Sequence, residues 1–266
     1  SSCCAMGCPR RMAPEPSSAG HWPSKLCGVG QFPGSSPHVA PSDLAASPYF
    51  TVAECSGIQL TPVIDASNCI WICGAFRNWF RGVIKLDFSG IEVLRISIKD
   101  QIVATPAISC GAVFFAIDFG LAAAYSVDTG EKLWTRKYAP ASGNDAWSMA
   151  ANQGVVIVAG KSKETMPWND SVYGLAAATG DVVWHFQSTL LIFFTPSIVD
   201  SALIFSDMTG TLTSLRVADG VASWQDKARV GCRSTGQAVA VKSLSMIFVT
   251  ANRPGKRDWN APYGGQ

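Results

Sequence analysis

Short apolar runs separated by polar turn residues recur along most of this chain. The runs are rich in β-branched and aromatic residues, and glycine, aspartate or asparagine follows them closely. No helical period is sustained between them. The pattern therefore predicts short β-strands, most clearly at 113–115, 155–158, 203–205 and 246–249.

The strand pattern repeats with a period of roughly 40 residues. Thr61-Pro62, Thr105-Pro106 and Thr195-Pro196 each open a unit, and Ser148 and Thr235 occupy the matching phase of the other two. Four units carry a glycine turn near their end, at Gly90, Gly130, Gly180 and Gly220, with spacings of 40, 50 and 40 residues. A tryptophan stands four residues past three of these glycines, at Trp134, Trp184 and Trp224.

Tandem units of four short antiparallel strands predict an all-β fold, a β-propeller of four-stranded antiparallel blades. Four blades are complete and a fifth is incomplete, which indicates an open arc of a larger propeller. The blades are expected near 61–98, 105–138, 147–187, 195–226 and 235–266. The alternative is that residues 49–54 supply an outer strand that closes the ring. WD-type and kelch repeats are disfavoured, because their Gly-His and Trp-Asp pairs or paired glycines are absent at the required phases.

Each blade has two apolar faces, so neighbouring blades must stack to cover them. The large indoles suit the space between blades, and glycine suits the preceding turn because it accepts positive φ. The residues predicted to dock the blades are Trp134, Trp184, Trp224, Gly130, Gly180 and Gly220.

Three unit ends carry a more specific signature. They are 122–134 (AAAYSVDTGEKLW), 171–184 (SVYGLAAATGDVVW) and 214–224 (SLRVADGVASW). Each resembles the pyrroloquinoline-quinone (PQQ) repeat family, in which a small residue, Asp-x-x-Thr-Gly and a tryptophan close a blade. The resemblance covers residues 49–266, although the first unit has Leu94 at the tryptophan position.

This resemblance implies two functions, which the repeat alone does not separate. Quinoprotein dehydrogenases of the family hold PQQ and calcium in an eight-bladed propeller, whereas other members are cofactor-free scaffolds in bacterial outer-membrane protein assembly. Residues 168–187 are similar to a blade of the quinoprotein alcohol dehydrogenases. Residues 188–194, however, contain no carboxylate for calcium or general-base chemistry. Five units are also too few for an eight-bladed body, so no catalytic or metal-binding residue is assigned.

Charge and composition disfavour nucleic-acid binding and a membrane-spanning helix. A formal net charge of +2 lacks the concentrated basic surface that nucleic-acid binding needs. The uncharged stretch 182–199 is too polar for a membrane helix, and no secretory signal follows Arg10 and Arg11. Residues 1–48 are rich in proline, serine and cysteine and read as a flexible tail. Cys69 and Cys73 would lie about 13 Å apart along a strand, too far to share a metal.

A candidate ligand rim follows from strand order, because every loop between a second and a third strand emerges on one face of a propeller. Units one, three and five have long loops there, which combine cations with aromatic rings suited to an anionic sugar, a peptide or a nucleic acid. Solvated, variable loops without a ligand would also explain this composition. The rim residues are Arg77, Trp79, Arg81, Lys161, Lys163, Trp168, Asn169, Arg253, Arg257 and Trp259. His185 is interpreted as a structural or exposed outer-strand residue.

The leading hypothesis is a non-enzymatic scaffold that binds a protein or small molecule on this long-loop face. The alternative is a fragment of a PQQ- and calcium-dependent alcohol or sugar dehydrogenase. The chain itself does not indicate its compartment, and the resemblance favours an extracytoplasmic one.

Overall fold

A computed structural model describes most of the repeat region. The described residues are 55–57, 60–76, 80–142, 148–163, 170–188, 196–207, 211–226, 238–241 and 245–249. The predicted tail 1–48 and the expected outer strand at 49–54 lie outside them.

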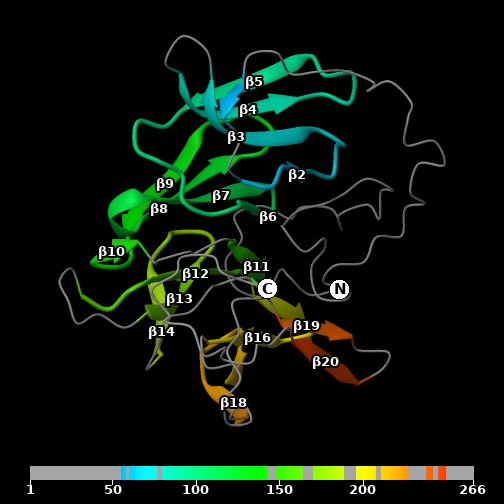
Figure 1. Ribbon diagram of the computed structural model, residues 1–266. Coiled ribbons are helices and arrows are strands. Elements are labelled where there is room, and N and C mark those ends of the chain that lie inside the picture. Colours follow the sequence, from blue (N-terminus) through cyan, green and yellow to red (C-terminus); the bar gives the residue numbers. More distant parts are fainter. Residues whose placement is uncertain are drawn as a thin grey trace, which may run out of the picture.

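Five separate antiparallel sheets, here called blades one to five, follow one another along the chain (Figure 1). Blade one contains β1 (Cys55–Gly57), β2 (Val63–Ile64), β3 (Ile70–Phe76), β4 (Arg81–Leu86) and β5 (Glu92–Ser97). Blade two contains β6 (Ala107–Ser109), β7 (Ala112–Ile117), β8 (Leu121–Ser126) and β9 (Lys132–Lys137). Blade three contains β10 (Ala141–Ser142), β11 (Ala150–Asn152), β12 (Val155–Lys161), β13 (Asp170–Ala176) and β14 (Val182–Gln187). Blade four contains β15 (Ser197–Val199), β16 (Ala202–Ser206), β17 (Leu212–Arg216) and β18 (Ala222–Asp226), and blade five contains β19 (Ala238–Val241) and β20 (Met246–Val249).

This arrangement confirms the predicted all-β propeller of antiparallel blades. Blades two and four are four-stranded, blades one and three carry a fifth short strand, and two strands of blade five are described. Within the described ranges the only helical element is the 3-10 turn Asp118–Gly120, and no sheet closes on itself. No helix there is long and apolar enough to cross a membrane. The sheets succeed one another as an arc from blade one to blade five (Figure 1).

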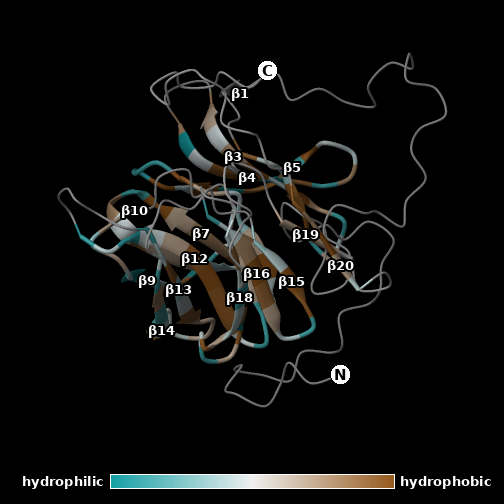
Figure 2. Cartoon of the chain, turned by 60° about the horizontal axis from the view of Figure 1, so that its bottom comes forward, coloured by the Kyte–Doolittle hydropathy of each residue, from teal (hydrophilic) through white to brown (hydrophobic). Residues whose placement is uncertain are grey.

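Burial on both faces explains why the second strands are continuously apolar. In β7, Val113 and Phe115 face blade one, whereas Phe114 and Ala116 face blade three, and all four are buried. A strand covered on both sides needs no polar alternation. The outer strands differ, since β9 buries Trp134 alone. Hydrophobic colour accordingly follows most of the strands in Figure 2, and hydrophilic colour gathers in the turns.

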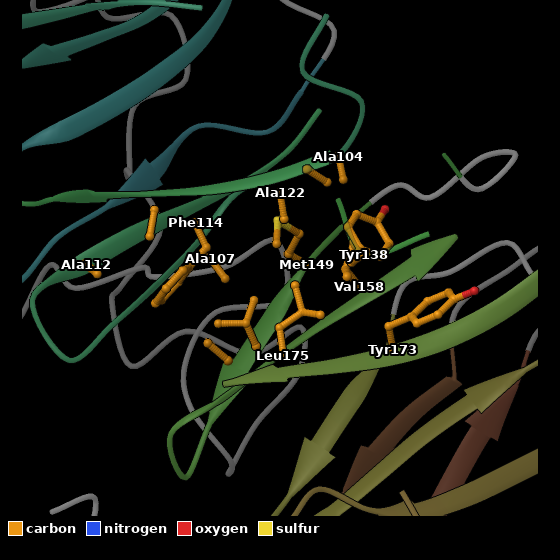
Figure 3. Packing of buried hydrophobic residues seen from close by; sticks show 14 of the residues in the cluster. Ala104, Ala107, Ala112, Phe114, Ala122, Tyr138, Met149, Val158, Tyr173 and Leu175 are labelled. Atoms are coloured by element: carbon orange, nitrogen blue, oxygen red, sulfur yellow. The ribbon is translucent and has the colours of Figure 1, made fainter. Parts of the chain in front are cut away.

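Small side chains of one blade meet large side chains of the next. Between blades two and three, Ala107 and Ala122 share a buried cluster with Val158, Tyr173 and Leu175 (Figure 3). Tyr138 and Met149, from the connection between these blades, complete the same cluster. Alternation of small and large residues lets the sheets approach closely and fill the contact.

Candidate functional site

The long-loop face is the end of the blades where second and third strands are joined. Arg81 begins β4, Lys161 ends β12, and Lys163 follows shortly after it, so blades one and three bring these cations to the same end of the molecule. Arg81 and Lys163 are exposed, and Lys161 is half-buried. The other predicted rim residues lie outside the described part of the chain, namely Arg77, Trp79, Trp168, Asn169, Arg253, Arg257 and Trp259.

Two short strands that the sequence pattern did not predict extend this face. Cys55 of β1 pairs with Phe76 in blade one, and Ala141 of β10 pairs with Lys161 in blade three. Correspondingly, β3 and β12 are 7 residues long, whereas β7 has 6 and β16 has 5. Blades one and three therefore project farther on the side of their long loops.

Hydrogen bonds between blades hold β10 in place. The Ser142 hydroxyl donates to the Ile117 carbonyl at 3.2 Å and accepts from the Gly120 backbone N–H at 3.2 Å. The Tyr138 backbone N–H donates to the Gly120 carbonyl at 2.8 Å. Gly120 has a φ of +71°, and a Cβ there would lie 2.1 Å from the Ala139 carbonyl oxygen. The short turn of blade two thus anchors the edge of the long-loop face in blade three.

Two of the three tryptophans predicted to dock the blades, Trp134 and Trp184, contact the following blade. The Trp134 indole N–H donates to the Ala177 carbonyl of blade three at 2.9 Å, and Trp184 donates to Val217 of blade four at 2.8 Å. These tryptophans are 6% and 7% exposed, whereas Trp224 is 40% exposed. A Cβ on Gly180 would lie 2.5 Å from the Trp134 ring, and one on Gly220 would lie 2.6 Å from Trp184. At Gly130 the neighbouring side chain is Leu94, and a Cβ on this glycine would lie 2.6 Å from the Leu94 side chain.

A buried ion pair that the sequence analysis missed replaces the indole between blades one and two. Lys85 Nζ lies 2.9 Å from Asp65 Oδ2 and donates to the Val127 carbonyl at 2.9 Å. The Trp71 indole N–H donates to Asp65 at 2.9 Å, and the Lys85 ammonium lies 5.0 Å from the Trp71 ring centroid. Burial alone would raise the pKa of Asp65, but hydrogen bonds from Lys85, Trp71 and Cys69 outweigh it and lower the pKa.

The acceptor of this lysine is the same backbone position that accepts the indoles. Val127, Ala177 and Val217 each precede the turn glycine of their blade by three residues. Lys85 reaches that position because it pairs with Leu94 across the β4–β5 hairpin, just as Gly174 pairs with Trp184. In blade one the long side chain has therefore moved from the fourth strand to the third.

The remaining titratable groups have structural roles. His185 is partly exposed and stacks on Tyr173 with ring centroids 4.6 Å apart, and partial burial lowers its pKa. The Tyr173 hydroxyl donates to the Lys161 carbonyl at 3.2 Å. Cys69 and Cys73 are free thiols, and complete burial raises the pKa of Cys73.

A calcium site requires several oxygen ligands that converge on one point. Across the described ranges, no three histidine, cysteine, aspartate or glutamate side chains lie close enough together to hold a metal ion. The Asp65 carboxylate is already occupied by Lys85 and Trp71. The described residues therefore do not offer a converging set of calcium ligands.

Comparison with known proteins identifies related propellers. The family model described as outer membrane protein assembly factor BamB matches residues 118–264. No curated protein matches the chain. BamB from Moraxella catarrhalis has 15% sequence identity and a TM-score of 0.52, with 71% of this chain and 60% of that chain covered.

Two enzymes are similar in structure as well. The quinohemoprotein alcohol dehydrogenase from Comamonas testosteroni has 11% identity and a TM-score of 0.55, with 75% of this chain and 40% of the enzyme covered. A europium-containing methanol dehydrogenase has 12% identity and a TM-score of 0.55, with 75% and 52% covered. At these identities the likeness shows the fold alone, and this chain spans 40% to 60% of the three proteins.

Proposed function

We propose, from the premise that this chain belongs to the family described as outer membrane protein assembly factor BamB, that it is a non-enzymatic scaffold for protein assembly. The observation that carries the proposal is the family match over residues 118–264, more than half of the chain. Those residues include blades three and four and all three tryptophan-bearing outer strands, β9, β14 and β18. The scaffold works without PQQ or calcium, in an extracytoplasmic compartment, and its partner is a protein.

The long-loop face is the proposed binding surface. Arg81 and Lys163 present exposed cations there, and β1 and β10 extend the two blades that bear them. Loops held on a rigid scaffold are a common location for binding residues. An acidic or aromatic protein segment would complement these cations and the aromatic rim residues of the same loops.

A reconstituted outer-membrane protein assembly reaction that lacks its BamB tests the scaffold function. We expect the purified chain to accelerate membrane insertion of an outer-membrane protein, and the Arg81→Glu, Lys163→Glu double variant to lose most of that effect. Lys132→Glu on the outer strand β9 is the matched control and should behave as wild type. No acceleration by the wild-type chain would contradict the proposal.

A dehydrogenase assay separates the scaffold from the enzyme alternative. The chain is loaded with PQQ and calcium, and alcohol-dependent dye reduction is measured. We expect no turnover above the free-cofactor background, because the described residues provide no converging calcium ligands. Sustained turnover would overturn the proposed function in favour of a quinoprotein dehydrogenase.

A further inference from the structure

Phe119 lies exposed in the short turn of blade two, in a backbone conformation that aromatic residues rarely adopt. Its φ is 65° and its ψ is 22°, and it is 66% exposed. The other described non-glycine residues with positive φ include no aromatic residue; they are Asn68, Cys110, Gln153, Asp200 and Ser245. Left-handed φ favours glycine, asparagine or aspartate, and a bulky side chain strains the backbone there. Neither burial nor backbone preference therefore accounts for a phenylalanine at this position.

Hydrogen bonds on both sides hold this turn in a fixed position. The Asp118 backbone N–H donates to the Gln101 carbonyl at 2.9 Å. On the other side, Gly120 donates its backbone N–H to the Ser142 hydroxyl, and its carbonyl accepts from the Tyr138 backbone N–H. An exposed ring on a rigid support is already positioned for a partner, so its binding costs little conformational entropy.

The same contacts connect the turn to cations of blades one and three. Toward blade one, the connection 98–101 carries the exposed Lys99, and the Ile98 backbone N–H donates to the Arg81 carbonyl at 3.1 Å. Toward blade three, the turn lies beside β10, which pairs with β12 at Lys161 (Figure 1). The aromatic ring of blade two is therefore flanked by the two blades that bear the rim cations.

Positive charge predominates around the turn. The cations in these connections and strand ends are Arg81, Lys99, Lys137, Lys161 and Lys163. The carboxylates in the same segments are Asp100, Asp118 and Asp170. All of the cations except Lys161 are exposed, whereas Asp170 is buried. The surroundings of the exposed ring therefore complement a negatively charged partner.

We propose that Phe119 anchors an acidic segment of a partner protein that carries an aromatic side chain. The partner's ring packs on Phe119, and its carboxylates lie against the cations on either side. This inference deepens the proposed scaffold function and rests on it in that the partner is a protein. It also places the anchor in blade two, whose short turn has none of the predicted rim residues.

One substitution should change stability and binding in opposite directions. Phe119→Asn replaces the ring with a side chain that tolerates left-handed φ, and asparagine commonly precedes glycine in tight turns. We expect a higher urea midpoint than wild type and an affinity for the acidic peptide that is lower by about tenfold or more. Phe119→Gly suits the same backbone and should lose affinity equally. A residue kept for packing would instead give a lower midpoint when replaced.

Binding is measured by fluorescence anisotropy with the full chain and a short dye-labelled peptide of glutamates around one tryptophan. Two comparison peptides replace the tryptophan by alanine or the glutamates by lysine. We expect saturable binding of the acidic aromatic peptide alone, weakened by Phe119→Asn, by Arg81→Glu and by added salt. Phe88→Asn is the matched control, because Phe88 is 70% exposed in the turn after β4, at the opposite end of that strand from Arg81.

The outcomes separate this site from the scaffold function. Equal binding by wild type and Phe119→Asn, or no binding by wild type, would refute the site. Binding of a single-stranded oligonucleotide through Phe119, without binding of the peptide, would refute it as well. If the site is refuted while the assembly reaction is still accelerated, the scaffold function stands. If the peptide binds through Phe119 but assembly is not accelerated, the scaffold function falls and the site stands.

Discussion

The contacts on the two sides of blade two satisfy equivalent backbone carbonyls by different chemistry. Between blades two and three, the Trp134 indole donates to Ala177 and its ring covers Gly180. Between blades one and two, the Lys85 ammonium donates to Val127, while Leu94 covers Gly130. A single tryptophan thus combines two tasks that blade one divides between a lysine and a leucine.

The difference shows what the propeller requires at each contact. The acceptor lies in a tight turn and is buried by the next sheet, so it needs a donor of sufficient length whatever its charge. An indole brings no charge, whereas the lysine must be neutralised by Asp65, which is itself buried. The charged version therefore depends on a second residue, and blade one is the more vulnerable of the two to single substitutions.

Removing Asp65, the partner of the buried Lys85, should lower stability more than any of the single changes below. We expect Asp65→Ala to lower the free energy of unfolding by about 3–5 kcal/mol, because Lys85 would remain as a buried charge without its partner. Urea denaturation measures the change. Asp181→Ala is the control, since its pair with Arg136 is exposed to solvent and should contribute far less to stability than the buried pair. A loss below about 1 kcal/mol for Asp65→Ala would show that the pair is dispensable.

Removing an indole donor should have an intermediate effect. Trp184→Phe keeps an aromatic ring between blades three and four but leaves the Val217 carbonyl without its donor. We expect a loss of about 1–3 kcal/mol in urea denaturation. Trp224→Phe should change stability by less than about 0.5 kcal/mol, because Trp224 is 40% exposed and no described residue accepts its indole N–H. Similar losses in the two variants would mean that the hydrogen bond contributes little.

Acid should weaken the charged contact selectively. The folded-state pKa of Asp65 is lowered, so its contribution is complete above the ordinary aspartate pKa of about 3.9 and is lost as the pH falls through the lower folded value. Between pH 5 and pH 2.5, stability of wild type should fall more steeply than that of Asp65→Asn, by up to about 1.4 kcal/mol per pH unit. Trp184→Phe should retain the steep wild-type slope, and identical slopes in wild type and Asp65→Asn would contradict this assignment.

The smallest effect is expected from the surface ion pair that joins blades two and three. Arg136 Nε lies 3.3 Å from the Asp181 carboxylate, and both side chains are more than half exposed. Arg136→Ala should change stability by less than about 0.5 kcal/mol at low salt and by less still at 1 M salt. A larger loss of stability that persists at high salt would mean that the aliphatic part of Arg136, rather than its charge, stabilises this contact.

The repeat in the sequence was sufficient to predict the blades, since apolar runs, glycine turns and spacing reflect local backbone requirements. The rim prediction could be followed only in part, with Arg81, Lys161 and Lys163 on the expected end of their sheets. The strands β1 and β10 escaped prediction because two or three residues carry no periodicity of their own. They pair only where the long β3 and β12 offer an edge.

The Lys85 contact shows most clearly what could not be predicted from the sequence. In blade three, Gly174 lies six residues before the turn glycine Gly180 and pairs with Trp184. The same spacing in blade one would pair Ile84, six residues before Gly90, with Leu94. Lys85, five residues before Gly90, pairs with Leu94 instead. In blade one the turn is tighter, with the Gly90 N–H donating to Asp87, and the pairing shifts by one residue.

The sequence by itself determined that this chain stacks four-stranded sheets, because the alternation of apolar strands and glycine turns is a local property. Only the tertiary structure decided which donor serves each contact between the described blades and where the short strands β1 and β10 pair. Those outcomes depend on register and on atoms from another blade, and a shift of one residue moves a side chain to the opposite face of a sheet.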